Sequence, residues 1–361
     1  MYRRFIFRRW PAPILAIAAG LLLPSCKKNG RSSPKSNSAI VYVAGTEQIG
    51  GSVNQAVYWT NGTPKELTTD ALFSEATGIV ASDSGLYICG DGTGQGTTHN
   101  VARYWRNGVN FDLTDGIVDA FARGIALSGS DVYVCGYETS RNLTYPTNVV
   151  RYWKNGQAVT LSDSSYMAYC FGIAISGNDI YVAGAESNGP HLVAKYWKNG
   201  VSYDLSDGSN DEYATAIAVS GNEVYVAGYE FRSDGYLIAK YWHDGIETDL
   251  SKPPDQGWAV GVAVSGSEVY VSGFESNGPE VDSNMNDVAK YWKNGASVAL
   301  TGVHDYAQGE GITIVNGTLY MVGYDYNGIT QTARLWVNGD STILNGPGIT
   351  NAEALAVFVS P

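Results

Sequence analysis

The feature that most constrains this chain is an internal repeat that is marked in two places. A tyrosine within a short β-branched run recurs seven times, 44 to 50 residues apart, at Tyr42, Tyr87, Tyr133, Tyr181, Tyr225, Tyr270 and Tyr320. A second marker, a tryptophan followed closely by Asn-Gly or Asp-Gly, keeps the same period at Trp59, Trp105, Trp153, Trp197, Trp242, Trp292 and Trp336. Two markers in step indicate seven copies of one structural unit.

Each unit contains four segments with the character of short strands. An apolar run such as residues 172–176 precedes the tyrosine strand, and a leucine-containing segment such as residues 201–205 follows the tryptophan strand. Ser-Gly and related pairs join the first two strands, and Asn-Gly, the favoured two-residue type I′ turn, joins the last two. No amphipathic helical stretch interrupts the pattern. Each unit is therefore predicted to be a four-stranded antiparallel meander.

The ends of the repeat region predict how the seven units are arranged. The first unit begins directly at its tyrosine strand, whereas residues 353–360 at the end of the chain match the strand that it lacks. Four-stranded units of 40 to 50 residues are typical of propeller blades. We therefore predict an all-β fold, a seven-bladed β-propeller over residues 39–361. Its last strand completes the first blade and leaves no open edge between the two ends.

Charge is distributed unevenly along the chain. Residues 1–36 hold 8 of the 23 Lys and Arg residues and none of the 35 Asp and Glu residues. The predicted propeller is therefore strongly acidic and lacks the basic stripe that nucleic-acid binding requires. Nucleic acid is excluded as an expected partner.

The N-terminus has the features of an export signal. Four arginines precede an apolar run over residues 13–23, which is too short to span a bilayer comfortably. The run ends in Leu-Pro-Ser before Cys26, which resembles a bacterial lipobox. The prediction is a lipoprotein signal peptide over residues 1–25 and a flexible tether over residues 26–38 that starts at lipidated Cys26. This lipid would be the only membrane contact. The alternative is an ordinary secretory signal with an incidental cysteine.

Taken together, the tyrosine strands and the Trp-x-Asn-Gly turns resemble those of exported bacterial β-propeller repeat proteins over residues 39–360. The resemblance implies the propeller fold and a place in the cell envelope, either periplasmic or surface-exposed. Most members of that family have no known function, so it implies no activity.

A candidate binding site comes from a position at which the repeats disagree. Just before the first strand of each blade lie Glu75, Phe121, Tyr169, Tyr213, Trp258, Gln308 and Glu353. Around a ring they form an aromatic arc of four blades facing an acid and amide arc of three. Aromatic faces beside carboxylates and amides suit sugar rings, which stack through C–H groups and hydrogen-bond through hydroxyls. The alternative is that these aromatic side chains only pack between blades.

A second repeated pattern predicts ion pairs. An acid follows each tyrosine strand, at Glu47, Asp91, Glu138, Glu186, Glu230, Glu275 and Asp325. A base precedes the aromatic pair in six blades, at Arg103, Arg151, Lys195, Lys240, Lys290 and Arg334. We expect each base to face the acid of its own blade across the hairpin. Val57 occupies this position in the first blade, which leaves Glu47 without that partner.

Metal and cofactor chemistry have little support in the sequence. Residues 282–287 resemble a calcium loop but lack its glycine and its final glutamate. The four histidines are scattered over four blades. Cys89, Cys135 and Cys170 occupy alanine positions, as small buried residues do, although a bridge between Cys135 and Cys170 stays open. We expect no metal and no cofactor.

The expected function is binding without turnover, by an envelope protein whose propeller face takes a carbohydrate or a protein partner. One alternative is a glycan-active hydrolase or lyase with Glu75 and Glu353 as acid and base, because these residues belong to adjacent blades of the closed ring. Carboxylates held in ion pairs would count against it. Another alternative is a scaffold subunit of an envelope complex, which would expose an apolar patch.

Overall fold

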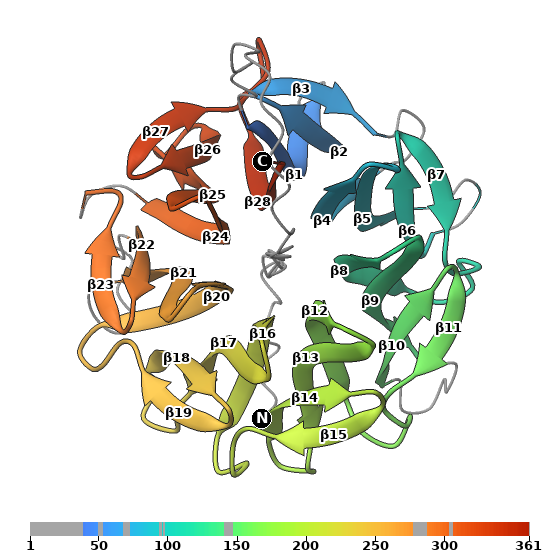
Figure 1. The fold of residues 1–361 in the computed structure, drawn as a ribbon, viewed down its shortest axis with the longest axis vertical. Coiled ribbons are helices and arrows are strands. Elements are labelled where there is room, and N and C mark those ends of the chain that lie inside the picture. The colour runs from blue at the N-terminus through green and yellow to red at the C-terminus, as the bar shows by residue number, and fades with distance from the viewer. Residues whose placement is uncertain are drawn as a thin grey trace, which may run out of the picture.

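The structure is a ring of seven four-stranded antiparallel sheets, as predicted (Figure 1). It is a computed structural model that describes residues 39–49, 53–67, 73–93, 96, 98–140, 147–276, 287–302 and 306–360. Each sheet is one blade, and its strands follow one another from the axis of the ring outward. The seven innermost strands surround the axis, and the outermost strands form the rim.

The strands of each blade are given from the axis outward. Blade 1 holds β28 (Ala352–Ser360), β1 (Ile40–Ile49), β2 (Val53–Thr60) and β3 (Thr63–Glu66). Blade 2 holds β4 (Ser74–Ser82), β5 (Gly85–Thr93), β6 (Asn100–Arg106) and β7 (Val109–Asp112). Blade 3 holds β8 (Ala120–Ser128), β9 (Asp131–Thr139), β10 (Asn148–Lys154) and β11 (Gln157–Thr160). Blade 4 holds β12 (Ala168–Ser176), β13 (Asp179–Ser187), β14 (Leu192–Lys198) and β15 (Val201–Asp204).

The remaining blades repeat the same order. Blade 5 holds β16 (Asp211–Ser220), β17 (Glu223–Phe231), β18 (Leu237–His243) and β19 (Ile246–Asp249). Blade 6 holds β20 (Gln256–Ser265), β21 (Glu268–Ser276), β22 (Asp287–Lys293) and β23 (Ala296–Ala299). Blade 7 holds β24 (Tyr306–Val315), β25 (Thr318–Tyr326), β26 (Gln331–Val337) and β27 (Asp340–Ile343).

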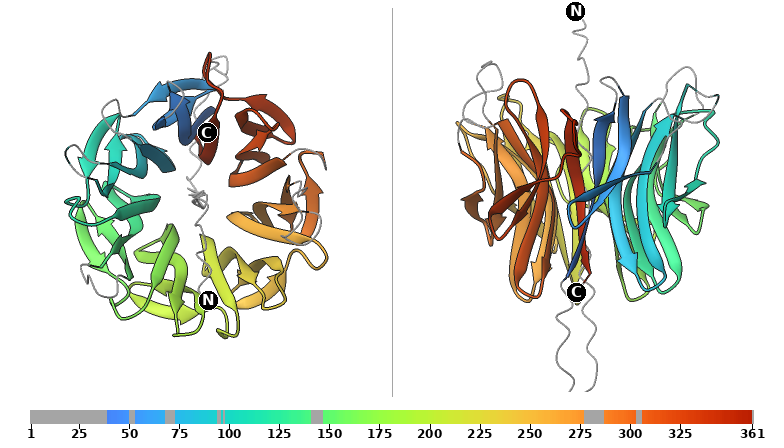
Figure 2. Two further views of the ribbon diagram at one scale, coloured as in Figure 1. Left: turned by 180° about the vertical axis from the view of Figure 1, so that it is seen from behind. Right: turned by 90° about the horizontal axis from the view of Figure 1, so that it is seen from above.

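The ring closes where the prediction placed the closure. Strand β28 pairs antiparallel with β1, from Ile40 opposite Ser360 to Glu47 opposite Ala352. Figure 2 shows the first and last strands side by side in this blade, β1 in blue and β28 in red. Beyond the strand pairing, the Gln48 N–H donates to the Asn351 carbonyl at 2.7 Å. Blade 1 is therefore assembled from residues more than 300 positions apart.

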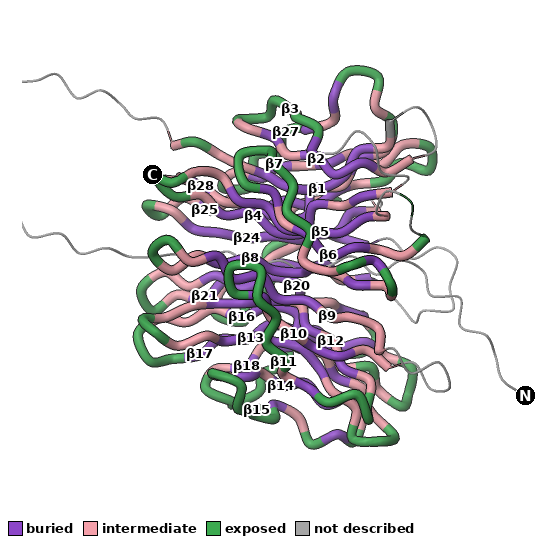
Figure 3. Tube along the Cα trace, turned by 90° about the vertical axis from the view of Figure 1, so that its right-hand side faces the viewer, coloured by how far each residue is buried: buried purple, intermediate pink, exposed green. Residues whose placement is uncertain are grey.

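The seven repeated tryptophans are the largest side chains of the core. All seven are fully buried, and they lie in the apolar layers between neighbouring blades. Figure 3 shows this burial along the inner strands, while the outer strands are exposed. Removal of a buried tryptophan from such a layer costs about 3–5 kcal/mol. The tryptophan marker in the sequence is thus the device that holds one blade against the next.

The Asn-Gly pairs form the turns that their sequence predicts. The first residue of each turn has a positive φ, from 48° at Asp244 to 52° at Asn107, and the following glycine is also positive. These angles are those of a type I′ turn. The turn side chain adds a further contact, because its Oδ1 accepts the N–H of a residue near the start of the tyrosine strand, as Asn155 does from Val132 at 2.9 Å.

Each innermost strand carries a β-bulge at the same place. The repeated glycine, three residues after the tyrosine on the neighbouring strand, makes room for this bulge. A Cβ added to Gly136 would lie 1.9 Å from the carbonyl oxygen of Phe121, and the same clash arises in the other six blades. Only glycine permits so close an approach of two backbones. The repeated glycine therefore fixes where the bulge occurs.

Five of the six predicted acid–base pairs are confirmed. The nitrogen–oxygen distances are 3.0 Å for Arg151–Glu138, 2.8 Å for Lys195–Glu186, 2.9 Å for Lys240–Glu230 and 2.7 Å for Arg334–Asp325, and Lys290 contacts Glu275. The prediction for Arg103 and Asp91 is wrong. Asp91 follows its glycine directly, whereas each other acid stands two residues after its glycine. Because side chains alternate along a strand, Asp91 points to the opposite face and faces Glu75.

The proposed signal peptide over residues 1–25, Cys26 and the tether to residue 38 lie outside the described residues. The calcium-like segment 282–286 and His304 lie outside them as well. Within the part of the chain that the structure describes, no helix is long and apolar enough to cross a bilayer.

The ion pairs of blade 5 predict a pH dependence of stability. Lys240 is surrounded by Glu230, Glu247, Asp249 and, at 3.9 Å, the buried Glu212. Burial raises the pKa of Glu212 to about 8. The folded protein then holds a proton that the unfolded chain releases above pH 4.5, so stability falls as the pH rises from about 5 to 8, by up to about 1.4 kcal/mol per pH unit.

Glu212→Gln should remove this part of the pH dependence. Urea unfolding at pH 5, 6.5 and 8 is expected to show the variant gaining stability over the wild type as the pH rises. Asp234→Asn, which removes an exposed carboxylate from the same blade, is the control for the loss of one negative charge. A constant difference between Glu212→Gln and the wild type over this range would contradict the prediction.

Candidate functional site

The seven predicted site residues share one register position, immediately before the bulge of each innermost strand. We call this set the axial ring: Glu75, Phe121, Tyr169, Tyr213, Trp258, Gln308 and Glu353. The strands begin earlier than predicted, one or two residues before these positions, so the residues lie within the strands. The seven innermost strands surround the axis and run in the same direction along it, and each member of the set lies near the start of its strand. The axial ring therefore lies at one end of the axis (Figure 1). Six members are half-buried and Gln308 is buried.

The aromatic members of the axial ring belong to a continuous row of rings over blades 3 to 6. The contacts within the row join ring centroids 4.8 to 6.5 Å apart, in the order Phe121, Tyr137, Tyr169, Tyr213, Tyr229, Trp258 and Phe274. Phe171 also stacks on Tyr169. We call these eight residues the aromatic arc. The rings do pack between blades, as the alternative held, and the arc still presents half-buried faces.

Part of the aromatic arc was not predicted. Tyr137, Tyr229 and Phe274 come from the second strand of their blades and lie opposite Phe121, Tyr213 and Trp258. Tyr213 stacks on Tyr229 with 22° between the ring planes, so the inner ring of the pair is supported by a buried one. A signal for this second row exists in the sequence. An aromatic residue stands directly between the repeated glycine and the acid in four blades, as in Gly136-Tyr137-Glu138.

The phenol groups of the arc remain protonated at neutral pH. Burial raises the pKa of Tyr169 to about 12, and it raises the pKa values of Tyr137, Tyr213 and Tyr229 as well. A protonated tyrosine hydroxyl both donates and accepts hydrogen bonds. The half-buried tyrosines therefore offer an apolar face together with a polar tip, which is the combination that a sugar ring can use.

One end of the aromatic arc meets a charged group in blades 2 and 3. Arg123 occupies the bulge of β8, with its guanidinium carbon 5.1 Å from the ring centroid of Phe121 and 5.7 Å from that of Tyr137. Its Nη1 donates to Glu75 at 2.5 Å and lies 3.6 Å from an oxygen of Asp91. Burial raises the pKa of Asp91 well above its usual range, and the nearby Glu75 adds to this. Arg123 thus supplies a positive charge beside the two carboxyl groups of Glu75 and Asp91.

The opposite, polar side of the axial ring is a hydrogen-bonded network in blades 6 and 7. Gln308 accepts a hydrogen bond from the Tyr324 hydroxyl at 2.5 Å and donates to Asp287 at 2.6 Å. Glu353 accepts from Gln331 at 2.8 Å. Asp287 also contacts Ser276. The side-chain amide of Gln308 is therefore engaged in hydrogen bonds within the protein.

Glu310 is a further acid that the sequence did not single out. It occupies the bulge of β24, is fully buried, and neither of its carboxyl oxygens has a hydrogen-bond partner. Burial raises its pKa well above the usual range, and the charge of Glu353 adds to this effect. Such surroundings favour the neutral form of a carboxyl group. In other blades this position holds a residue such as Thr77, which donates to the Ala122 carbonyl of the next blade at 2.8 Å.

The geometry does not favour Glu75 and Glu353 as a catalytic pair. Glu75 is held by Arg123 in an ion pair, and Glu353 accepts a hydrogen bond from Gln331. Asp91, the carboxyl nearest to Glu75 in register, is fully buried and out of reach of a ligand. The ion pair of Glu75 therefore counts against the hydrolase interpretation, whereas Glu353 accepts its hydrogen bond from an uncharged amide.

Cysteine and histidine positions add no reactive group to the site. All three cysteines that the structure describes are free, and the Cys170 thiol donates to the Gly136 carbonyl at 3.0 Å. The bridge left open between Cys135 and Cys170 is not formed. Among the described residues, Glu223, His243 and Asp244 form a group of three potential metal ligands, but it lies on an exposed turn of blade 5 away from the axial ring.

Comparison with solved structures finds the same fold in two peptidases. A Mycobacterium tuberculosis puromycin-hydrolyzing peptidase matches with a TM-score of 0.53 and 12% identity, over 84% of this chain and 53% of that one. The uncomplexed Pyrococcus horikoshii acylaminoacyl peptidase matches with a TM-score of 0.52 and 11% identity, over 86% of this chain and 51% of that one. The chain spans about half the length of both proteins, and at such identity the likeness shows the fold alone. No protein-family model and no curated protein matches the chain.

The Arg123 group predicts a pH-dependent loss of stability. Arg123→Met should leave two neighbouring buried or half-buried carboxyls without their cation, at a cost of about 3–5 kcal/mol at pH 8. The cost should be smaller at pH 5, because the raised pKa of Asp91 allows this carboxyl to take up a proton as the pH falls. Guanidinium unfolding at both pH values tests this. Arg106→Met, which removes an arginine that lies over the Tyr87 ring, is the matched control. An equal cost at both pH values would argue against the proposed charge balance.

Proposed function

We propose that this protein is a lipid-anchored component of the bacterial cell envelope whose propeller binds carbohydrate through the aromatic arc. The observation that carries the proposal is the continuous row of aromatic rings from four adjacent blades, with half-buried faces at one end of the axis. Rings of this kind suit the C–H faces of sugars, and the tyrosine hydroxyls and the Glu75 carboxylate beside them suit sugar hydroxyls.

The scaffold alternative finds less support in the surface. Its sign would be a contiguous exposed apolar patch. Many of the large exposed apolar side chains among the described residues lie instead on the outer strands of separate blades, as Val109, Val201 and Ile246 do. Single exposed apolar residues are ordinary features of a soluble surface. The aromatic arc is a more specific candidate for recognition.

Removal of Trp258 should weaken glycan binding by about tenfold or more, because it removes a half-buried face and leaves Phe274 beneath it unpaired. The full-length protein would be screened on a glycan array, and affinities for the hits would be measured by titration calorimetry. Near-ultraviolet circular dichroism would show that Trp258→Ala remains folded.

Tyr203→Ala is the matched control for this experiment. Tyr203 lies on outer strand β15 and stacks on Tyr196 at 5.0 Å, so the variant removes an aromatic pair outside the arc. Equal affinity in the wild type and Trp258→Ala would sink the proposed site. Release of shortened glycans over time would favour the hydrolase, and capture of an envelope protein without any glycan binding would favour a protein partner.

Anchoring through Cys26 is a separate proposal that rests on the lipobox and the acidic body behind it. In a bacterial host fed an alkyne-labelled fatty acid, the wild type should carry the label and sediment with membranes. Cys26→Ser should lose both properties, whereas Cys170→Ser, which changes a buried propeller cysteine, should keep them. A Cys26→Ser variant that still carries the label would contradict lipidation at this residue.

A further inference from the structure

Blade 1 differs from the other six blades at one buried position. On the third strand from the axis, the residue that pairs with the repeated glycine is Val57, opposite Gly45. The other blades hold an arginine or a lysine at this position. Val57 is fully buried. The first blade therefore lacks the cation that each other blade supplies from its own third strand.

Blade 4 shows what that cation does. Lys195 lies between two carboxylates, at 2.8 Å from Glu186 and 3.2 Å from Asp204. Asp204 stands opposite Lys195 on the outer strand. In blade 5 the same arrangement places Lys240 at 2.9 Å from Glu230 and 3.5 Å from Asp249. In these blades one ammonium group neutralises two acids from two different strands.

Blade 1 keeps both acids of this arrangement. Glu47 stands two residues after its glycine, as Glu186 does, and Glu66 stands opposite Val57, as Asp204 stands opposite Lys195. Glu47 is 4% exposed and accepts the Gly346 N–H at 2.7 Å. Burial raises the pKa of Glu47, the Gly346 hydrogen bond lowers it, and the charge of Glu66 raises it further. The two carboxyls are thus close enough to repel each other.

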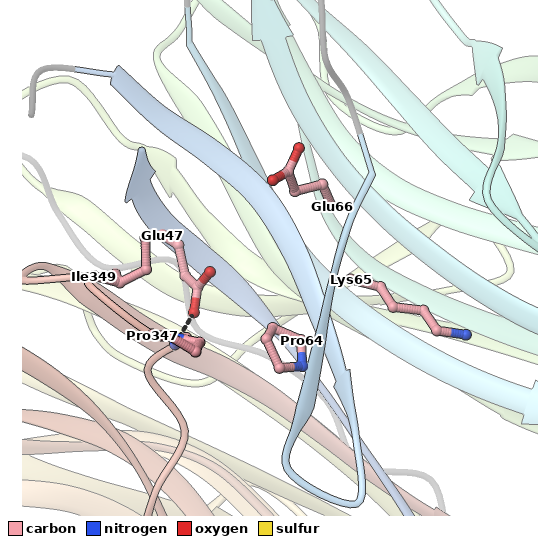
Figure 4. Close-up of a pocket in the computed structure, with 7 residues that line it drawn as sticks. Glu47, Pro64, Lys65, Glu66, Pro347 and Ile349 are labelled. Carbon is pink, nitrogen blue, oxygen red and sulfur yellow. Dashed lines mark hydrogen bonds between the residues drawn. The ribbon is translucent and has the colours of Figure 1, made fainter. Parts of the chain in front are cut away.

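A pocket of about 300 Å³ lies beside these two acids. Glu47, Glu66, Lys65 and Gly346 contribute to its lining, and Pro64, Pro347 and Ile349 supply apolar walls. Figure 4 shows the Glu47 carboxylate between these walls, at the seam where the last blade passes into the first. An acidic end beside apolar walls suits an ammonium group carried on a short alkyl chain.

Lys65 does not replace the missing base. It is opposite Tyr58, so it shares a face of the sheet with Tyr58 and not with Glu66. Its Nζ lies 5.7 Å from the centroid of the Tyr58 ring. Figure 4 shows the side chain extending away from Glu47. Among the described residues, the group of three potential metal ligands lies in blade 5 and not here, so this pocket is a poorer match for a metal ion.

We propose that this pocket binds a primary alkylammonium group, from a free amine or from a lysine side chain of another molecule. The ammonium takes the place that Lys195 has in blade 4, between Glu47 and Glu66, and the alkyl chain lies against Pro64, Pro347 and Ile349. The site is separate from the aromatic arc and does not depend on the function proposed for it.

Thermal unfolding of the full-length protein with n-butylammonium chloride tests the proposal. The melting temperature should rise by about 2 °C or more and saturate, relative to sodium chloride and tetramethylammonium chloride at equal ionic strength. Tetramethylammonium is the control cation because it has no N–H donors. Nα-acetyl-lysine methylamide distinguishes the sources: an equal response shows that a lysine within a peptide fits, and a response to butylammonium alone identifies a free amine.

Three variants make the result specific. Glu66→Gln, at an exposed position, should weaken the response to butylammonium at least about fivefold. Val57→Lys should supply the cation from within, raise the melting temperature and abolish the response. Lys195→Ala should lower the melting temperature and create a second, comparable response in blade 4, which calibrates the measurement.

Three results would overturn the proposal. The first is a response in Lys195→Ala with none in the wild type, which would show that the assay detects such a site and that blade 1 has none. The second is a wild-type response that Glu66→Gln and Val57→Lys leave unchanged. A stabilisation by calcium that Glu66→Gln removes, without any by butylammonium, would assign the pocket to a metal and would also overturn the proposal.

Discussion

The close approach of two backbones at each bulge is the constraint on which the rest of the structure depends. The repeated glycine admits the carbonyl of the preceding axial-ring residue to a place where any side chain would collide with it. The bulge that results turns the innermost strand and aims one residue per blade toward the axis. It also turns the bulge residue toward a neighbouring blade, which is how Arg123 of blade 3 reaches Glu75 of blade 2. The architecture of the ring and the composition of the site therefore have a common cause.

Most of the fold could be predicted from the sequence because each part of it depends on local residue types repeated seven times. The tyrosine and tryptophan strands, the type I′ turns and the completion of blade 1 by the last strand all follow from patterns that are visible in a single repeat or in its absence. The axial ring was accessible for the opposite reason, since its residues break the repeat. A position that varies from blade to blade stands out because the positions around it are alike in the repeats.

The parts that were missed depend on register, which composition does not reveal. Asp91 was grouped with the other acids because it follows a tyrosine strand, yet one residue fewer separates it from the glycine, and this places it on the other face. Tyr229 and Phe274 also follow the repeated glycine directly, and this register places them on the same face as the axial ring. Arg123 and Glu310 occupy bulge positions, and a bulge appears only once two strands have been paired. Counting from the glycine, and not from the acid, would have recovered the second row but not the bulges.

The closure of blade 1 by β28 has a consequence for how the chain reaches its structure. Strand β1 cannot complete its sheet until residues near position 355 have been synthesised, so the earliest blade is the last to become whole. Contacts of such long range slow the final step of folding and leave a strand edge open until then. The inner edge of β1 therefore has no partner strand until the last strand of the propeller is available to close the ring.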